Sequence, residues 1–320
     1  MQLQEEKHGQ RLTMEALDFQ QERSHLFKLA YRMLGSVAEA EDVVQETWLR
    51  WQKRCEQAGP AAGDTLPASY LYRIVTNISI DHLRSRSRQL ESYVGPWLPE
   101  PIVVSNNANA EQELEFRDTF SLGFLSMLEA LNPNERAVFV LKEAFGSDHA
   151  EIAEIVDTTE ANSRQLLKRG RNKLRDQGWP TAAQQTASTP EQRRKQRNLI
   201  EKFIRALRDA DTDQALKLLS NEALAISDGG GLVSAALVPL QGPDQIVKVL
   251  QYLARKTTGS NQLIWAEVNG QPGLLFYRED QLESVIAIEV SAAYIHRIFI
   301  QRNPTKLDHL TAVAPLARSS

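Results

Sequence analysis

The chain has 320 residues, more than one typical small domain, so we expect two or three domains. The net charge of −4 and the pI near 6.0 exclude a protein that coats nucleic acid non-specifically, so any contact with DNA must be local. Cys55 is the single cysteine, which excludes an internal disulfide and a multi-cysteine metal site, and we expect no metal or cofactor. The polar N-terminus and the absence of a long apolar run predict a cytoplasmic protein with no membrane partner.

The chain begins with a predicted block of amphipathic helices. The first runs from about Met14 to Leu34 and ends at Gly35, a natural C-terminal stop. Ser36 and Glu39 then form a capping box for a second helix that runs to about Arg54. The residues expected on its buried face are Val37, Val44, Trp48 and Trp51, and those left on its outward face are Asp42, Gln45, Glu46 and Leu49.

A third helix is predicted to begin at Pro67, after a Gly/Ala/Pro-rich loop. Apolar residues at Leu71, Ile74, Val75 and Ile78 mark its core face. Its polar face consists of Asn77, Asp81, Arg84 and Arg88, with Arg86 adding a further charge. Arginines at a helix end are usually a solvated tip, but beside a second basic helix they favour contact with phosphates.

The segment Glu91–Gln112 contains three prolines and predicts no regular structure. Its apolar residues, among them Trp97, Leu98 and Ile102, are costly to leave in water. We therefore interpret WLPEP, residues 97–101, as an extended segment anchored on a partner surface. The alternative is a spacer that is merely stiffened by proline.

The segment Glu113–Leu131 predicts another amphipathic helix, and Asn132, Pro133 and Glu135 begin the next one. Two helices with a tight turn follow. The first is His149–Val156, and Thr159 is the expected N-cap of the second.

The second helix of this pair carries a basic ridge with the spacing i, i+4, i+7 and i+11, formed by Arg164, Lys168, Arg171 and Arg175. Ser163, Leu167, Gly170 and Leu174 share the neighbouring face. A basic second helix of a helix-turn-helix fits the major groove of DNA. The alternative is a solvated basic face on an ordinary helical hairpin.

After Arg175 the composition becomes that of a linker, and a third domain follows. It begins with a helix from Thr189–Pro190 and a short helix Thr212–Leu219. A strand Ala223–Ser227, the sequence DGGG at 228–231 and a strand to Leu240 come next, and Pro243 begins a helix to about Lys256. The remaining segments alternate as strands, 262–268, 273–277, 281–290 and 293–301, with Asn269–Gly270 as a hairpin turn. This order predicts an α+β cone.

Three segments in order, EAEDVVQETWLRWQ, LPASYLYRIVTNISIDHLRSRSR and LNPNERAVFVLKEAFGSDHAEIAEIV…RGRNKLR, resemble the extracytoplasmic-function (ECF) branch of the sigma-70 family. The resemblance implies an initiation factor whose partners are RNA polymerase core and promoter DNA. Region 2 would meet the β′ clamp and the −10 element, and region 4 the β flap and the −35 element. It also shows departures, because Asp157 stands where the turn usually has Gly, and Thr158 and Ser163 replace apolar residues.

The implied sites fall on the faces already described. For the −35 element they are Arg164, Gln165, Lys168, Arg169 and Arg171. For the −10 element they are Asn77, Asp81, Arg84, Arg86 and Arg88. For polymerase they are Asp42, Gln45, Glu46 and Leu49.

The C-terminal order resembles SnoaL-like domains, and WLPEP, DGGG and NPTKL together resemble an ECF group that carries such a domain as a built-in regulator. In the last motif, Thr305 replaces an acidic residue of the family form. The implied regulatory residues are Trp97, Leu98, Pro99, Glu100, Pro101, Asp228, Gly229, Gly230, Gly231, Asn303, Pro304, Lys306 and Leu307.

The expected architecture is two all-α sigma domains followed by an α+β SnoaL-like cone. The expected boundaries are region 2 at 14–90, a linker at 91–112, region 4 at 113–178, a linker at 179–189, the cone at 190–310 and a tail at 311–320. The alternative for the cone is a sensor of an unknown small molecule or an enzyme, with Asp228, Asp244, Tyr252, Trp265 and His296 as possible cavity residues. No acid–base pair is evident by strand or helix spacing, so we predict that the protein is not an enzyme.

Overall fold

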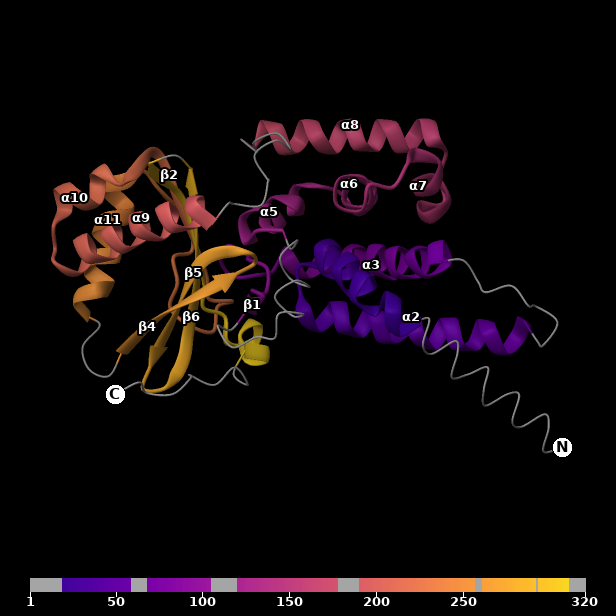
Figure 1. Ribbon diagram of the computed structural model, residues 1–320, viewed down its shortest axis with the longest axis horizontal. Coiled ribbons are helices and arrows are strands. Elements are labelled where there is room, and N and C mark those ends of the chain that lie inside the picture. Colours follow the sequence, from indigo (N-terminus) through magenta and orange to yellow (C-terminus); the bar gives the residue numbers. More distant parts are fainter. Residues whose placement is uncertain are drawn as a thin grey trace. The chain divides into compact units, whose positions relative to one another are not determined.

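The computed structural model describes residues 19–58, 68–104, 120–177, 190–256, 261–291 and 293–310. The chain forms two compact units (Figure 1). The first comprises Met1–Arg88 and Leu128–Trp179, and the second comprises Gln89–Met127 and Pro180–Ser320. Helices make up the regular structure described in the first unit, and a sheet with helices forms the second, as the predicted fold class requires.

The first part of the helical unit consists of the helix at residues 19–34, α2 (Val37–Ala58) and α3 (Ala68–Leu90). The predicted start at Met14 lies outside the described residues. The Ser36 hydroxyl accepts a hydrogen bond from Glu39 N at 3.1 Å, which confirms the predicted cap. Val44 and Trp51 are buried as expected, whereas Val37 and Trp48 are only half-buried. Ala40, Val43 and Thr47 are buried in their place, so the core-facing stripe is rotated slightly around the helix.

The rest of this unit consists of a 3₁₀ turn, η1 (Leu128–Ala130), followed by α6 (Pro133–Phe145), α7 (His149–Val156) and α8 (Glu160–Asp176). Asn132 and Glu135 form the predicted capping box, with reciprocal hydrogen bonds of 2.9 and 3.1 Å. The continuous helix predicted for 113–131 is not observed over its described part. That part is split into α5 (Leu122–Met127) and η1, because α5 packs in the second unit and η1 packs against α8.

The second unit has a seven-stranded sheet, in the order β1-β4-β5-β6-β7-β2-β3, among the described residues. Its central strands are β4 (Asn261–Val268), β5 (Gln271–Arg278), β6 (Gln281–Ser291) and β7 (Tyr294–Gln301), and all pair antiparallel. β2 (Leu219–Asp228) pairs in parallel with β7. The predicted strand leading to Leu240 was too long, because only β3 (Leu240–Gln241) joins the sheet. Its neighbours Leu237 and Val238 lie exposed in the preceding loop.

Three helices cover one face of this sheet (Figure 1): α9 (Pro190–Arg208), α10 (Thr212–Lys217) and α11 (Pro243–Lys256). Alternate residues of the strands face this layer, for example Leu274 and Ile298, while their neighbours Leu275 and Phe299 face the other side. That other side is covered by Leu98, by Leu122 of α5, and by Leu307 and Leu310 from the 3₁₀ turns η3 (Pro304–Lys306) and η4 (Asp308–Leu310).

The proline-rich segment is therefore an anchored part of the second unit and not a free spacer. Its end forms β1 (Val103–Val104), which pairs antiparallel with β4. The β4–β5 turn at Asn269–Gly270 has left-handed backbone at both positions, as predicted for a two-residue hairpin. Asn269 also holds the segment, because its Oδ1 accepts from Ile102 N at 2.9 Å and its backbone N donates to Ile102 O at 2.8 Å.

Candidate functional site

The helix-turn-helix is formed by α7 and α8, with caps at both sides of the turn. Asp157 ends α7 with φ 56° and ψ 59°, a left-handed conformation that Asp tolerates better than most residues. Thr159 is the N-cap of α8, and its hydroxyl accepts from Asn162 N at 3.2 Å, as predicted. The buried face of α8 consists of Ser163, Leu166, Leu167, Gly170 and Leu174. The turn therefore forms without the usual glycine.

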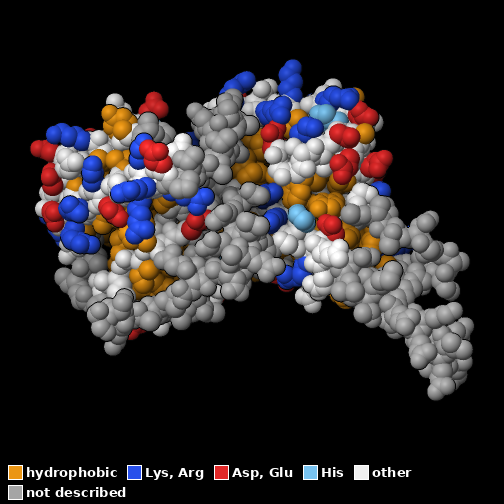
Figure 2. Space-filling view, in the orientation of Figure 1, with side chains coloured by type: hydrophobic (Ala, Val, Ile, Leu, Met, Phe, Trp, Pro, Cys, Tyr) orange, Lys and Arg blue, Asp and Glu red, His pale blue; other side chains and the backbone are white. Residues whose placement is uncertain are grey.

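The five residues expected to meet the −35 element, Arg164, Gln165, Lys168, Arg169 and Arg171, are all exposed. Figure 2 shows basic side chains gathered along the edge that α8 forms. Arg164 pairs with Glu160 on the same helix, and Arg171 pairs with Glu143 of α6, each at 2.5 Å. Lys168 and Arg169 have no ion pair within the described parts of the chain. This face can offer cations to phosphates, with Lys168 and Arg169 the most available.

The faces expected on α2 and α3 are also outward. On α2, Asp42, Gln45 and Leu49 are exposed, Leu49 by 57%, and Glu46 is half-buried beside Arg50 at 2.5 Å. On α3, Asp81, Arg84 and Arg88 are exposed and Asn77 is half-buried. An exposed leucine among polar groups is the kind of residue that a protein interface covers.

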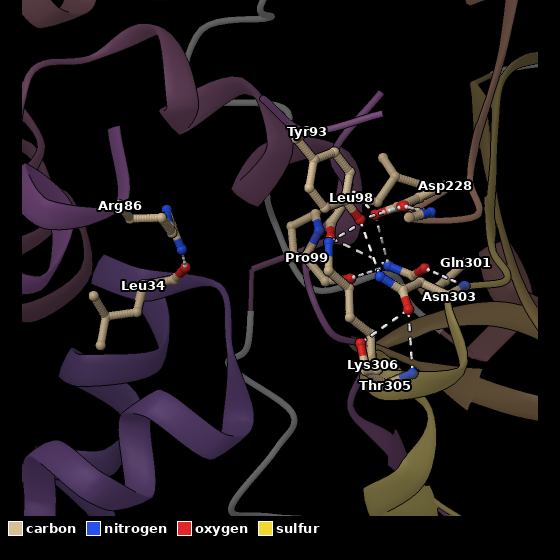
Figure 3. A network of polar contacts seen from close by, with 11 residues as sticks. Leu34, Arg86, Tyr93, Leu98, Pro99, Asp228, Gln301, Asn303, Thr305 and Lys306 are labelled. Atoms are coloured by element: carbon tan, nitrogen blue, oxygen red, sulfur yellow. Dashed lines mark hydrogen bonds and ion pairs between the residues drawn. The ribbon is translucent and has the colours of Figure 1, made fainter. Parts of the chain in front are cut away.

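Arg86 lies elsewhere than expected, because it is buried and does not share the exposed face of Arg84 and Arg88. Its guanidinium donates to the Leu34 carbonyl (Figure 3) and to Glu129 Oε1 at 2.9 Å. Arg136 of α6 donates to the same oxygen at 2.8 Å. We call Arg86, Glu129 and Arg136 the arginine cluster. Burial by itself raises the pKa of Glu129, but the two guanidiniums outweigh burial and hold that pKa below its usual value.

In the second unit, the three motifs meet at the side chain of Asp228, which is fully buried at the end of β2 (Figure 3). Its carboxylate accepts hydrogen bonds from Tyr93 Oη at 2.6 Å, Leu98 N at 2.8 Å and Gly230 N at 2.9 Å. Lys306 Nζ, also buried, donates to it at 2.7 Å. We call this assembly the motif junction. It comprises Tyr93, Leu98, Asp228, Gly230, Gln301, Asn303 and Lys306.

Lys306 joins the NPTKL motif to WLPEP as well as to DGGG. Its Nζ donates to the Leu98 carbonyl at 2.7 Å and lies 4.3 Å from the centre of the Trp97 ring. Pro304 begins the turn η3 that carries Lys306, and Leu307 packs with Leu98 in the core. The motif residues thus form one continuous contact within this unit.

The glycines of DGGG permit close approaches at the junction. Gly230 has φ 60°, and a Cβ built there would lie 2.2 Å from Asn303 Nδ2. Gly231 has φ 73° and lies against Val94, while a Cβ on Gly229 would lie 2.4 Å from the Val233 carbonyl. Three consecutive glycines are required by contacts and not only by a turn.

Sequence reasoning missed two members of the junction, Tyr93 and Gln301. Burial and the hydrogen bond to Asp228 raise the pKa of Tyr93, so its phenol stays protonated and remains a donor. Gln301 Nε2 donates to the carbonyls of Leu98 and Pro99, each at 3.1 Å. Tyr93 lies just before WLPEP and Gln301 just before NPTKL, so proximity to the motifs was the available signal.

Asn303 and Thr305 complete the NPTKL side of the junction. Asn303 Nδ2 donates to Tyr93 Oη at 3.1 Å, and its Oδ1 accepts from Thr305 N at 3.1 Å and from Thr305 Oγ1 at 2.9 Å. Thr305 therefore satisfies Asn303 without the negative charge of the family form. Glu100 and Pro101 continue the segment, with Glu100 half-buried and Pro101 buried.

The residues considered for a catalytic cavity are not brought together. Asp228 is occupied in the motif junction, and Trp265 packs with Arg197, whose guanidinium lies 4.7 Å from its ring centre. Asp244 and Tyr252 line an open cleft of about 690 Å³ beside α10 and α11, whose lining includes neither Trp265 nor His296. No group of three metal-binding side chains occurs among the described residues. None of the helices described is both long and apolar enough to span a membrane.

A helix-turn-helix with a cationic second helix, joined to a helical bundle with a polar outward face, defines a DNA-binding transcription protein. Comparisons with known families identify sigma-70 region 2 at residues 19–89 and sigma-70 region 4 at residues 121–174. The chain is 30% identical to the ECF RNA polymerase sigma factor SigJ of Mycobacterium tuberculosis over 312 residues, which cover 92% of this chain and 93% of that protein. It is 28% identical to the probable sigma factor SigI of the same species, covering 91% and 93%.

The crystal structure of M. tuberculosis SigJ superposes with a TM-score of 0.71 at 28% identity, covering 94% of this chain and all of that one. The chain therefore belongs to the ECF sigma factors of the sigma-70 family, with a C-terminal SnoaL-like extension. It is a factor for promoter-specific transcription initiation that acts with RNA polymerase core on promoter DNA, and not an enzyme.

Proposed function

We propose that the two sigma regions divide promoter recognition between them. In this proposal α8 contacts the −35 element through Arg164, Gln165, Lys168, Arg169 and Arg171, and the exposed face of α3 meets the −10 element. The outward residues of α2 bind the β′ clamp, and region 4 meets the β flap. The observation that supports the proposal is the exposed basic face of α8, on a helix-turn-helix whose turn is capped on both sides.

The salt dependence of promoter binding tests the −35 assignment. Each phosphate contact steepens the log–log dependence of affinity on salt by roughly one unit. Replacing Arg164, Lys168 and Arg171 by alanine should flatten the slope by about two to three units. The matched control replaces Lys195, Lys202 and Arg205 of α9 and should leave the slope unchanged. Equal slopes for the α8 variant and the wild type would refute the assignment.

We further propose that the SnoaL-like domain regulates the sigma regions through the chain that connects them. Residues 91–104 follow region 2 in the chain, and the motif junction holds Tyr93 and Leu98 of this segment in the C-terminal unit. The length of chain left to connect the two regions therefore depends on whether the junction is closed. On this proposal the expected linker, residues 91–112, acts as the controlled connection.

In vitro transcription with core RNA polymerase tests the regulatory role. Full-length protein should be compared with a chain ending before Pro190 and with Lys306→Met, which keeps the length of the side chain and removes its charge. Both changes should alter promoter-dependent transcription in the same direction. Lys248→Met, at an exposed site on α11, is the control. If the shortened chain and Lys306→Met both transcribe like the full-length protein, the regulatory proposal fails and a sensor that acts independently becomes the better account.

A further inference from the structure

Ser163 stands on the buried face of α8, at a position where the family pattern has an apolar residue. Its side chain is fully buried, yet its hydroxyl is satisfied, because Oγ lies 2.9 Å from Nδ1 of His149. His149 is the first residue of α7 and is half-buried. A buried polar group at a helix crossing is costly unless it is paired, so this hydrogen bond replaces an apolar contact with a directional one.

The hydrogen bond between Ser163 and His149 fixes α7 and α8, the two helices of the DNA-binding motif, relative to each other at one point. It joins the start of α7 to the first turns of α8, on the far side of the turn that contains Asp157 and Thr158. A shift of α8 along or around α7 would break it, whereas apolar side chains would tolerate such a shift. The angle of α8 determines where its basic face points, and Arg164 of that face directly follows Ser163 in the sequence.

The ring of His149 lies among charged groups of both signs. They are Lys142 and Glu143 of α6, Asp148 and Glu151 at the start of α7, and Glu160, Arg164 and Arg171 of α8. Burial, and then the charges of Lys142 and Arg164, lower the pKa of His149 below its usual value. In the absence of DNA the ring is therefore neutral at neutral pH.

We propose that His149 is a positioning residue that fixes α8 against α7 through Ser163 and that takes up a proton when α8 binds promoter DNA. The inference rests on the proposed role of α8 at the −35 element. Phosphates placed against Arg164 and Arg171 offset the positive charge that disfavours imidazolium. A hydroxyl can donate or accept, so the bond to Ser163 is retained in both charge states.

The sign of the resulting pH dependence follows from linkage. Because the bound state holds the proton more tightly, promoter affinity rises as the pH falls through the pKa of His149 in the complex. Between about pH 8 and pH 6 the affinity should rise by roughly three- to tenfold, with a slope of at most about one log unit per pH unit. The bond to Ser163 should persist over the same range.

The test is the dissociation constant of the full-length protein in holoenzyme with a promoter fragment, measured at several pH values and one ionic strength. The fragment is selected from random-sequence DNA with that holoenzyme. His149→Asn places an amide nitrogen near the position of Nδ1, so it keeps the bond to Ser163 but does not titrate. His82→Asn on α3 is the matched control, because His82 is also half-buried but lies outside the helix-turn-helix.

We expect the rise in promoter affinity at lower pH to be lost in His149→Asn and kept in His82→Asn. At about pH 8 both variants should discriminate between the selected −35 element and a scrambled one as well as the wild type does. Ser163→Ala, checked by thermal melting, should reduce discrimination between the selected −35 element and a scrambled one, with the salt slope unchanged. Parallel pH profiles for wild type and His149→Asn, or full discrimination by Ser163→Ala, would overturn the inference. If a scrambled −35 element does not weaken wild-type binding, it is instead the proposed role of α8 that fails.

Discussion

The arginine cluster and the motif junction both bury charge, but they are built differently. In the motif junction, backbone N–H groups of Leu98 and Gly230 and the Lys306 ammonium converge on one carboxylate. In the arginine cluster, two guanidiniums share Glu129, which is itself 24% exposed, and Glu39 lies 3.6 Å from Arg86. The junction gathers backbone groups around one buried side chain, whereas the cluster joins region 2 to region 4 through the ion pair between Arg86 and Glu129.

This difference suggests different roles. A carboxylate held by backbone donors is part of the fold of its unit, and losing it leaves a buried lysine and two backbone groups to be satisfied. The arginine cluster depends on ion pairs to a carboxylate that is partly exposed, so water partly screens its contribution. We therefore expect the junction to contribute more to stability than the cluster.

The largest effect should come from Asp228→Ala. Removing the carboxylate leaves the Lys306 charge buried without its counter-charge, which should cost about 3–5 kcal/mol of the free energy of unfolding of the C-terminal unit. Chemical denaturation of the full chain, followed by tryptophan fluorescence to which Trp97 beside Lys306 contributes, measures the loss. The double variant Asp228→Ala/Lys306→Met should recover part of it. A double variant less stable than Asp228→Ala would contradict the assignment.

Gly230→Ala should have the next largest effect, because it adds a Cβ at φ 60° only 2.2 Å from Asn303 Nδ2. Left-handed strain and overpacking together should cost about 2–3 kcal/mol. Gly242→Ala is the matched control, since its φ is 81° but nothing lies within 4 Å of the added Cβ. It should cost only about 1 kcal/mol. Equal melting temperatures for the two variants would show that Asn303 does not constrain the loop.

Glu129→Gln should cost less, about 1–2 kcal/mol, because Glu129 is partly exposed and Arg86 retains the Leu34 carbonyl and nearby Glu39. The pKa of Glu129 is lowered in the folded state, so its contribution is complete above the unfolded value near 4.5 and is lost as the pH falls through the lower folded value. The difference in stability between wild type and Glu129→Gln should therefore shrink in acid. A difference that stays constant down to about pH 2 would argue against the ion pairs.

Asp157→Gly should have the smallest effect, and it should be stabilising. Asp157 ends α7 in left-handed backbone, where glycine avoids the steric cost of a Cβ, so the helical unit should gain about 0.5–1 kcal/mol. Because the turn geometry is already formed, promoter selectivity should not change. A destabilised Asp157→Gly variant would show that the carboxylate contributes contacts of its own.

Local chemistry allowed most elements to be predicted from the sequence alone. The caps at Ser36, Asn132 and Thr159, the Asn269–Gly270 turn and the start of α11 at Pro243 depend on residues only a few positions apart. Each of these caps and turns is formed by the backbone and side chains of residues that are neighbours in the sequence, so a short stretch of sequence is enough to predict it. The outward faces of α2, α3 and α8 followed from helical periodicity, whereas the two sigma regions followed from the resemblance of three segments to the sigma-70 family.

Tertiary structure alone decided which residues share a site. Asp228 meets Leu98 across 130 residues, Lys306 meets Asp228 across 78, and Arg86 meets Glu129 across 43. Arg84 and Arg86 are the same residue type on the same helix, yet Arg86 is buried and Arg84 is exposed. Residues two positions apart on a helix lie on different sides of it. Helix periodicity repeats every few residues and contains no information about partners this distant, so the contacts that Tyr93 and Gln301 make with Asp228 and Leu98 follow only from the tertiary structure.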